Sequence, residues 1–108
     1  MIYGKFTKKA ETALVLAKEC ALGFGHPYIG TEHILWGLAK EGTGIAASVL
    51  ASSGITEVAI KQKIMELIGQ EEEEFSNLTY TPRTKRVMEL SYAEARRMGQ
   101  NFIGTEHL

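Results

Sequence analysis

The chain has 108 residues, which is the length of one ordinary domain and too short for two independent hydrophobic cores. Its formal net charge of -1 excludes a global positive field that would attract nucleic acid or an anionic membrane surface. A single cysteine excludes an internal disulfide, and no apolar run approaches the roughly 20 residues of a membrane-spanning helix. The first ten residues, MIYGKFTKKA, lack the apolar segment of a signal peptide. We therefore expect a soluble, cytoplasmic domain with no nucleic-acid or membrane partner.

Four helices are predicted in residues 1–69. Apolar residues between Thr7 and Phe24 recur at the three- and four-residue spacing of one helical face, and glycines end the segment. Three further segments each begin at a threonine and end at a glycine: residues 31–42, 43–54 and 56–69. We expect each threonine hydroxyl to accept a hydrogen bond from a free N–H of the first turn, and each glycine to end its helix. The last helix is expected to turn four apolar residues inward: Ile60, Ile64, Leu67 and Ile68.

Residues 70–80, QEEEEFSNLTY, interrupt this pattern. Four consecutive glutamates repel one another and cover no core, which indicates a solvated linker; a functional acidic tail is the less favoured alternative. Thr81 and Pro82 then begin a fifth helix, with the threonine at the N-cap and the proline in the first turn.

The sequence repeats itself with an offset of 74 residues. Residues 6–34 align with residues 80–108 without a gap, and nine of the 29 aligned pairs are identical. The stretch Ile-Gly-Thr-Glu-His occurs in both copies. We therefore divide the chain into a first repeat (1–69), an acidic linker (70–80) and the start of a second repeat (81–108). We expect it to be a fragment of a larger all-α domain built from two four-helix repeats.

The helix expected at residues 81–98 carries a stripe with fewer partners than its counterpart in the first repeat. The stripe consists of Val87, Met88, Ser91, Ala95 and Met98. We expect this helix either to dock on the first repeat or to borrow surface from a second chain, as a dimer or by helix exchange.

The duplicated Gly-Thr-Glu-His turn has two interpretations. In the structural one, glycine supplies backbone freedom, threonine caps a helix and glutamate complements the positive end of the helix dipole. In the functional one, the helix start binds an anion while the neighbouring carboxylate binds a guanidinium, which suits a ligand that carries both charges. Neither requires a histidine, so we expect His33 and His107 to be half-buried packing residues that hydrogen-bond back to the preceding loop.

The sequence indicates neither an enzyme active site nor a metal site. It contains no Walker A motif, dinucleotide-binding loop or nucleophile elbow. His26, Glu32 and His33 are close in sequence but lack the i, i+4 spacing of zinc ligands on a helix, and glutamine replaces His26 in the second copy. Cys20 corresponds to Glu94, so we expect an idle or structural thiol rather than a nucleophile.

Aromatic residues flank the long helices. Tyr3, Phe6 and Tyr80 are expected either in the core or lining a groove between the repeats, and Phe6 and Tyr80 correspond by the offset. Trp36, just after the first turn, is compatible with either a core or a rim position.

Several spaced motifs together resemble the N-terminal domains of ClpC-type Clp/AAA+ unfoldases. They are FTKKA at residues 6–10, the two IGTEH turns, EGTGIAA at residues 41–47 and YTPR at residues 80–83. The resemblance covers the whole chain and implies an all-α tandem repeat whose second copy is incomplete here. It also implies a domain that is not itself an enzyme and has no cofactor, placed ahead of rings that use ATP and Mg.

The resemblance implies a recognition function. Domains of this family recruit adaptors such as MecA and McsB, capture substrates for the ClpP protease and bind phosphoarginine, a degradation mark. Carried over by motif, Glu32 and Glu106 would bind the guanidinium of two equivalent sites. The phosphate would lie nearest to the residues before them: Gly30, Thr31, Gly104 and Thr105. The resemblance also places Tyr3, Tyr80 and Lys85 where the family binds cyclic-peptide antibiotics, and Phe6 joins them as a candidate residue of the partner groove.

The chain departs from the family pattern in two places. Trp36 replaces a usual leucine, and the helices expected to pack on the second turn would follow Leu108. We therefore expect the first phosphoarginine site to be the more complete one. The alternative function is a passive helical scaffold or spacer whose repeated turns only cap helices.

Overall fold

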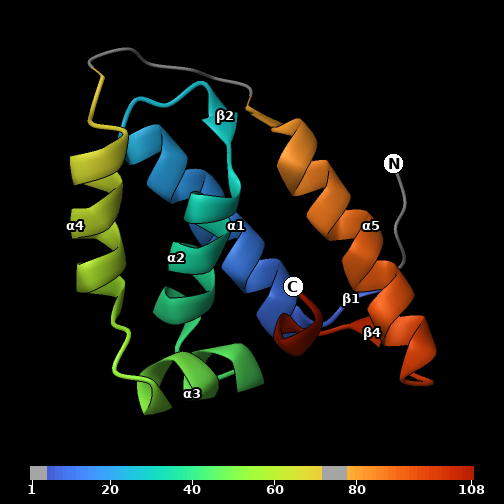
Figure 1. The fold of residues 1–108 in the computed structure, drawn as a ribbon. Helices are drawn as coiled ribbons and strands as arrows, with labels where there is room; N and C mark the ends of the chain where they lie inside the picture. Colours follow the sequence, from blue (N-terminus) through green and yellow to red (C-terminus); the bar gives the residue numbers. More distant parts are fainter. Residues whose placement is uncertain (1–4, 72–77) are drawn as a thin grey trace.

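The computed structural model describes residues 5–71 and 78–108. Within them, five α-helices make up most of the fold and are joined by two-residue strands and a short 3-10 helix (Figure 1). In chain order the elements are β1 (Lys5–Phe6), α1 (Lys8–Gly23), β2 (Tyr28–Ile29), α2 (Thr31–Glu41), α3 (Ile45–Ser52), α4 (Glu57–Leu67), β3 (Thr79–Tyr80), α5 (Pro82–Arg97), β4 (Phe102–Ile103) and η1 (Thr105–His107). Tyr3 lies outside the described residues. The all-α prediction is confirmed.

Threonine caps three of the helices as predicted. The hydroxyls of Thr7, Thr56 and Thr81 accept hydrogen bonds from first-turn N–H groups of α1, α4 and α5. Pro82 occupies the first turn of α5, where its missing N–H costs nothing because that group would have no intrahelical acceptor.

The predicted threonine caps of α2 and α3 are wrong. The N-cap residues are Gly30 and Gly44, and neither has a side chain that could cap its helix. Thr31 is already the first helical residue of α2. The hydroxyl of Thr43 contacts the carboxylate of Glu41 instead of a helix N–H. The first turn of α2 therefore lacks the side-chain oxygen that closes the other helix starts, whereas α3 receives one from the distant Thr105, whose hydroxyl accepts the N–H of Ala46.

The main core forms where α1, α2 and α5 meet. Its buried members are Ala13, Ala17, Ala21, Ile29, Ile34, Leu38 and Met88. Small residues dominate the α1 side, which lets α2 approach closely: a Cβ built on Gly37 would overlap the carbonyl oxygen of Ala13. This close crossing holds α2 against α1.

Helix α5 docks on the first repeat, which confirms the first of the two arrangements expected for its stripe. Met88 is only 1% exposed and packs in the main core. Helices α4 and α5 lie on opposite sides of the α1–α2 pair (Figure 1).

The two repeats exchange strand partners. β1 pairs in parallel with β4, and β2 pairs in parallel with β3. Because β1 corresponds to β3 and β2 to β4 by the repeat offset, the segment entering each long helix pairs with the turn of the other repeat. Thr79 and Tyr80, which were predicted to belong to a solvated linker, form β3. Residues 72–77 of that linker lie outside the described part of the chain.

Helix α4 covers the core with a narrower face than predicted. Ile60 and Ile64 are buried in a second cluster with Cys20 and Phe24. Leu67 and Ile68, which were also predicted to point inward, are 75% and 51% exposed. That part of the prediction is wrong. Across the described residues, no helix has the length and apolar character needed to cross a membrane.

Candidate functional site

The first Gly-Thr-Glu-His turn connects β2 to α2. Gly30 has φ −93° and ψ 173°, an extended conformation open to any residue, so the backbone freedom of glycine is not the reason for its presence. A Cβ built on Gly30 would instead overlap the carboxylate of Glu32. The glycine therefore makes room for the carboxylate to fold back over the start of α2.

The second turn repeats this arrangement. Gly104 has φ −93° and ψ 176°, and a Cβ there would overlap the carboxylate of Glu106. In both copies an acidic side chain thus lies against the glycine that precedes a helical turn. The same placement in two distant segments shows that it follows from the local Gly-Thr-Glu-His sequence.

The two turn histidines have the same local partner. Nδ1 of His33 accepts the backbone N–H of Gly30 at 2.9 Å, and Nδ1 of His107 accepts that of Gly104 at 2.8 Å. Each histidine stands at the third helical position, where glutamate or glutamine makes the equivalent bond in a capping box. The expectation that they bond back to the loop is confirmed, although both are buried rather than half-buried, at 2% and 8% exposed.

A second histidine extends this bonding in the first copy. Nε2 of His33 lies 2.8 Å from Nδ1 of His26, and Nε2 of His26 lies 2.7 Å from the carbonyl oxygen of Gly69. Gly30 must donate and Gly69 must accept, which assigns both protons: each histidine is neutral with its proton on Nε2. We call this chain of hydrogen bonds through His33 and His26 the relay. It joins the first turn to the end of α4.

The relay is absent from the second copy. Exposed Gln100 stands where His26 stands in the first copy, and Nε2 of His107 has no hydrogen-bond partner within the described residues. The first turn is therefore held by one more hydrogen-bonded link than the second.

The relay predicts a loss of stability at mildly acidic pH. Burial lowers the pKa of His33; the nearby Glu32 carboxylate opposes this decrease, and His26 adds to it. The folded state binds a proton on His33 more weakly than the unfolded chain does. The stability that neutral His33 contributes is therefore complete above the unfolded pKa of about 6.5 and is lost as pH falls below that value. We expect the thermal unfolding midpoint to decrease as the pH is lowered from about 7.5 to about 5.5. In the His33→Gln variant, which keeps a capping acceptor but cannot titrate, the decrease should be smaller. Equal decreases in the two proteins would contradict the assignment.

A hollow of about 210 Å³ opens beside the first turn. It is lined by residues of the turn, the end of α4 and the start of α5: His26, Pro27, Tyr28, Gly30, Glu32, His33, Ile68, Glu71 and Thr81. Glu32 is half-buried, and exposed Glu71 adds a second carboxylate. The backbone N–H of Glu71 is tied to the carbonyl oxygen of Phe24 at 2.8 Å. This first-turn hollow combines two acidic groups with a helix start that has no side-chain cap.

The second turn packs against the start of α3. Thr105 is buried, and its hydroxyl accepts the N–H of Ala46 at 3.2 Å, at the start of α3. Its side chain also occupies the space that a Cβ on Gly44 would need. Thr31, its counterpart, is half-buried. The two turns thus place their carboxylates alike but differ in how far their threonines are exposed to solvent. In the second turn only Glu106 is exposed.

The other proposed partner residues are placed separately. Phe6 and Tyr80 are half-buried and pack against the main core, next to the second and first turns respectively through the strand pairs. Burial raises the pKa of Tyr80. Lys85 is exposed on α5.

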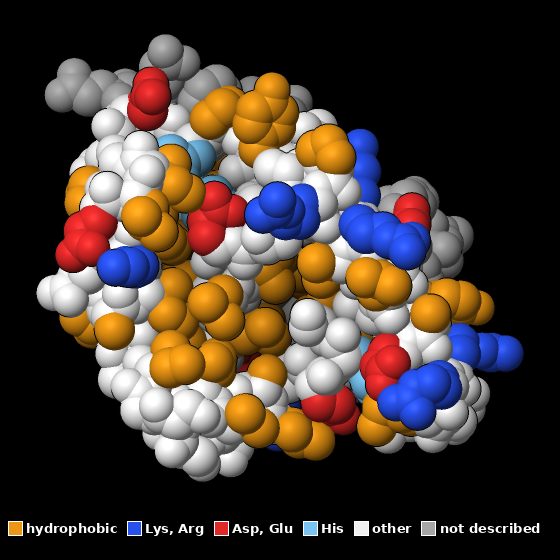
Figure 2. Space-filling model, in the orientation of Figure 1, with side chains coloured by type: hydrophobic (Ala, Val, Ile, Leu, Met, Phe, Trp, Pro, Cys, Tyr) orange, Lys and Arg blue, Asp and Glu red, His pale blue; other side chains and the backbone are white. Residues whose placement is uncertain are grey.

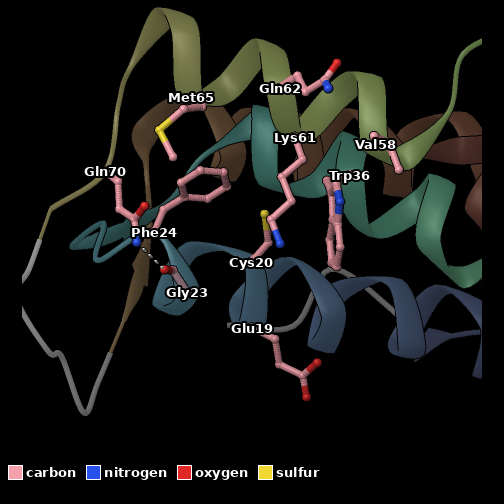
Figure 3. A pocket seen from close by; sticks show the side chains of 10 residues that line it. All are labelled: Glu19, Cys20, Gly23, Phe24, Trp36, Val58, Lys61, Gln62, Met65 and Gln70. Carbon is pink, nitrogen blue, oxygen red and sulfur yellow. Dashed lines mark hydrogen bonds between the residues drawn. The ribbon is translucent and has the colours of Figure 1, made fainter.

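A larger hollow of about 510 Å³ lies over α1, between α2 and α4 (Figure 3). The ammonium of Lys61 stands 5.7 Å from the ring centre of Trp36 and 6.0 Å from that of Phe24. Trp36 is therefore a half-buried wall residue rather than a core residue. Burial raises the pKa of the Cys20 thiol to about 11, against the opposing charge of Lys61. A neutral, buried thiol fits the structural role predicted for Cys20.

Sequence reasoning missed the contribution of distant segments to the first-turn hollow. Glu71 was placed in a solvated linker and Ile68 in the core. The sequence offers no signal for this placement, because Ile68 and Glu71 lie far along the chain from the first turn and reach it only through the fold. The metal reading of His26, Glu32 and His33 finds no support: within the described residues no group of three potential metal ligands is gathered.

Comparison with known proteins identifies related domains. Residues 5–108 match the Clp repeat (R) N-terminal domain family. The ClpC/MecB protein of Bacillus subtilis, a negative regulator of genetic competence, is 48% identical over all 108 residues, and the chain spans 13% of its length. The N-terminal domain of the chaperone ClpD from Arabidopsis thaliana has the same fold, with a TM-score of 0.83 and 24% identity over 99% of this chain and 74% of that one. The ClpV N-domain, solved in complex with a VipB peptide, is similar with a TM-score of 0.75 and 18% identity over 95% of this chain and 64% of that one.

Proposed function

Because the chain belongs to the Clp repeat N-terminal domain family, we propose that it is the substrate- and adaptor-recognition domain of a ClpC-type unfoldase. In this proposal the parent protein is a cytoplasmic, ATP-dependent unfoldase that works with the ClpP protease and receives substrates from adaptors of the MecA and McsB kind. The domain itself binds proteins marked by phosphoarginine, at the turn Gly30-Thr31-Glu32 and more weakly at Gly104-Thr105-Glu106.

The observation that carries the proposal is the position of the Glu32 carboxylate. It lies against Gly30, directly beside the start of α2, and it lines the first-turn hollow. Phosphoarginine carries a guanidinium next to a phosphoryl group. The carboxylates of Glu32 and Glu71 suit the guanidinium, and the positive end of α2 with its uncapped N–H groups suits the phosphoryl group.

The passive-scaffold alternative keeps a capping role for the turn, but His33 supplies it in place of Thr31. It required Thr31 to cap α2, but Gly30 holds the N-cap position and offers no side-chain oxygen. The turn is stabilised instead by His33 from the inside. Among the described residues the Glu32 carboxylate forms no hydrogen bond, so complementing the positive end of α2 is the structural role that remains for it.

Removal of the Glu32 charge should weaken phosphoarginine binding by about ten- to a hundredfold, because a hydrogen bond to a charged group contributes about 1.5–3 kcal/mol. The test is calorimetric titration of the wild-type chain and the Glu32→Gln variant with free phosphoarginine. Glu106→Gln should have a smaller effect because Thr105 is already used within the molecule.

The matched control is Glu11→Gln. Glu11 is also an acidic residue in the first turn of a helix, but it lies on α1 and is exposed. The control should bind like the wild type. Equal affinity of Glu32→Gln and the wild type would refute the assignment of the site.

A further inference from the structure

An apolar groove runs between α2 and α4 and is not explained by the fold. It has a volume of about 390 Å³ and is lined by Glu32, Leu35, Ile55, Ala59, Ile60, Lys63, Ile64, Leu67 and Ile68. Four of its large apolar residues are at least 40% exposed: Leu35, Ile55, Leu67 and Ile68. Figure 2 shows hydrophobic side chains gathered in a hollow between the two helices. Large apolar side chains that converge on one exposed groove are typical of an interaction site.

The groove is continuous with the first-turn hollow. Glu32 and Ile68 line both cavities, so the carboxylate that would hold a guanidinium stands at one end of the groove. Apart from Glu32 and Lys63, the groove lining is apolar. A chain segment anchored at Glu32 by a cationic group would therefore place its neighbouring residues on apolar surface.

The groove has the length of a short peptide. Its lining on α4 extends from Ala59 to Ile68, about 13 Å at the helical rise per residue, which matches about four residues of extended chain. Resting on the function proposed above, we infer that the site reads phosphoarginine together with its sequence context. The occupant is an extended peptide segment in which the phosphoarginine lies at Glu32 and apolar side chains on one side of it enter the α2–α4 groove.

Two phosphoarginine peptides test this inference, one with leucine and one with serine at the two positions on either side of the phosphoarginine. The wild-type chain should bind the leucine peptide at least about tenfold more tightly, because partial burial of one or two leucines suffices for that difference. The Leu67→Ser variant should lose most of this preference and bind free phosphoarginine unchanged. Leu67 is 75% exposed, so its replacement leaves the core intact. The control Leu90→Ser, at an exposed leucine of α5, should keep the preference.

The outcomes separate this inference from the proposed function. Binding of free phosphoarginine with equal affinity for the two peptides would overturn the sequence preference and leave the phosphoarginine site standing. Binding of an unphosphorylated leucine peptide as tightly as the phosphorylated one would overturn joint recognition. Absence of binding of free phosphoarginine and of both peptides would overturn the proposed function and the inference with it.

Discussion

Replacement of Gly37 by alanine is expected to lower the free energy of unfolding by about 2–3 kcal/mol, the upper part of the range for overpacked cores. The added methyl group would overlap the carbonyl oxygen of Ala13 and lie 3.0 Å from the backbone nitrogen of Ala17. Both atoms belong to the backbone of α1, so no side-chain rotation can relieve the overlap. Helices α1 and α2 would have to move apart, which would loosen the main core.

The matched control is Gly23→Ala. Gly23 is the last residue of α1, and a Cβ there would meet nothing within 4 Å. Its unfolding free energy should stay within about 0.5 kcal/mol of the wild-type value. Urea denaturation followed by circular dichroism measures both variants. An unchanged midpoint for Gly37→Ala would show that the crossing of α1 and α2 is not as tight as described.

Replacement of His33 by leucine should destabilise the domain by about 2–4 kcal/mol, because it leaves buried polar groups without partners at about 1–3 kcal/mol each. The groups are the N–H of Gly30 and Nδ1 of His26, which now bond to the two nitrogens of the His33 ring. Leucine has a similar size, so a large loss would come from hydrogen bonding rather than from a cavity.

His33→Gln separates the two bonds. Glutamine at the third helical position can accept the N–H of Gly30, as in a capping box, so the loss should be clearly smaller than for leucine. Chemical denaturation at neutral pH gives both values. Similar losses for leucine and glutamine would show that the bond to Gly30 contributes little, and would contradict the role assigned to the turn histidines.

The repeat made much of the fold predictable. The 74-residue offset identified the paired turns and the paired long helices, and the threonine caps of α1, α4 and α5 followed from local chemistry that depends only on neighbouring residues. The all-α class followed from the helical spacing of apolar residues. These features are encoded within one turn or one helix, where sequence reasoning is strongest.

Interactions between distant segments were not predictable in the same way. Because the two copies are alike, the sequence could not show that β1 pairs with β4 rather than with β2 of its own repeat. The role of Gly30 was also misread: its importance comes from a side chain two residues later, not from its own backbone angles. The exposure of Leu67 and Ile68 depends on how α4 lies against α2, which the apolar spacing of α4 alone does not determine.

The difference between the two turns arises from tertiary contacts. The sequence of the two turns is identical from Gly to His, yet Thr105 is buried and bonded to α3, while Thr31 is half-buried. Likewise, His26 bonds to the histidine of the first turn, whereas Gln100, at the corresponding position, leaves Nε2 of His107 without a partner among the described residues. Identical local motifs therefore offer different access to a ligand.

The most direct test of phosphoarginine recognition is a backbone amide NMR titration of the isotope-labelled chain. Addition of phosphoarginine should shift the amide signals of Thr31 and Glu32 first and most, with weaker shifts at Glu106. Arginine or inorganic phosphate alone at the same concentration should produce much smaller changes, because each satisfies only one half of the site. Shifts confined to other parts of the chain, or no shifts at saturating phosphoarginine, would contradict the proposed recognition site.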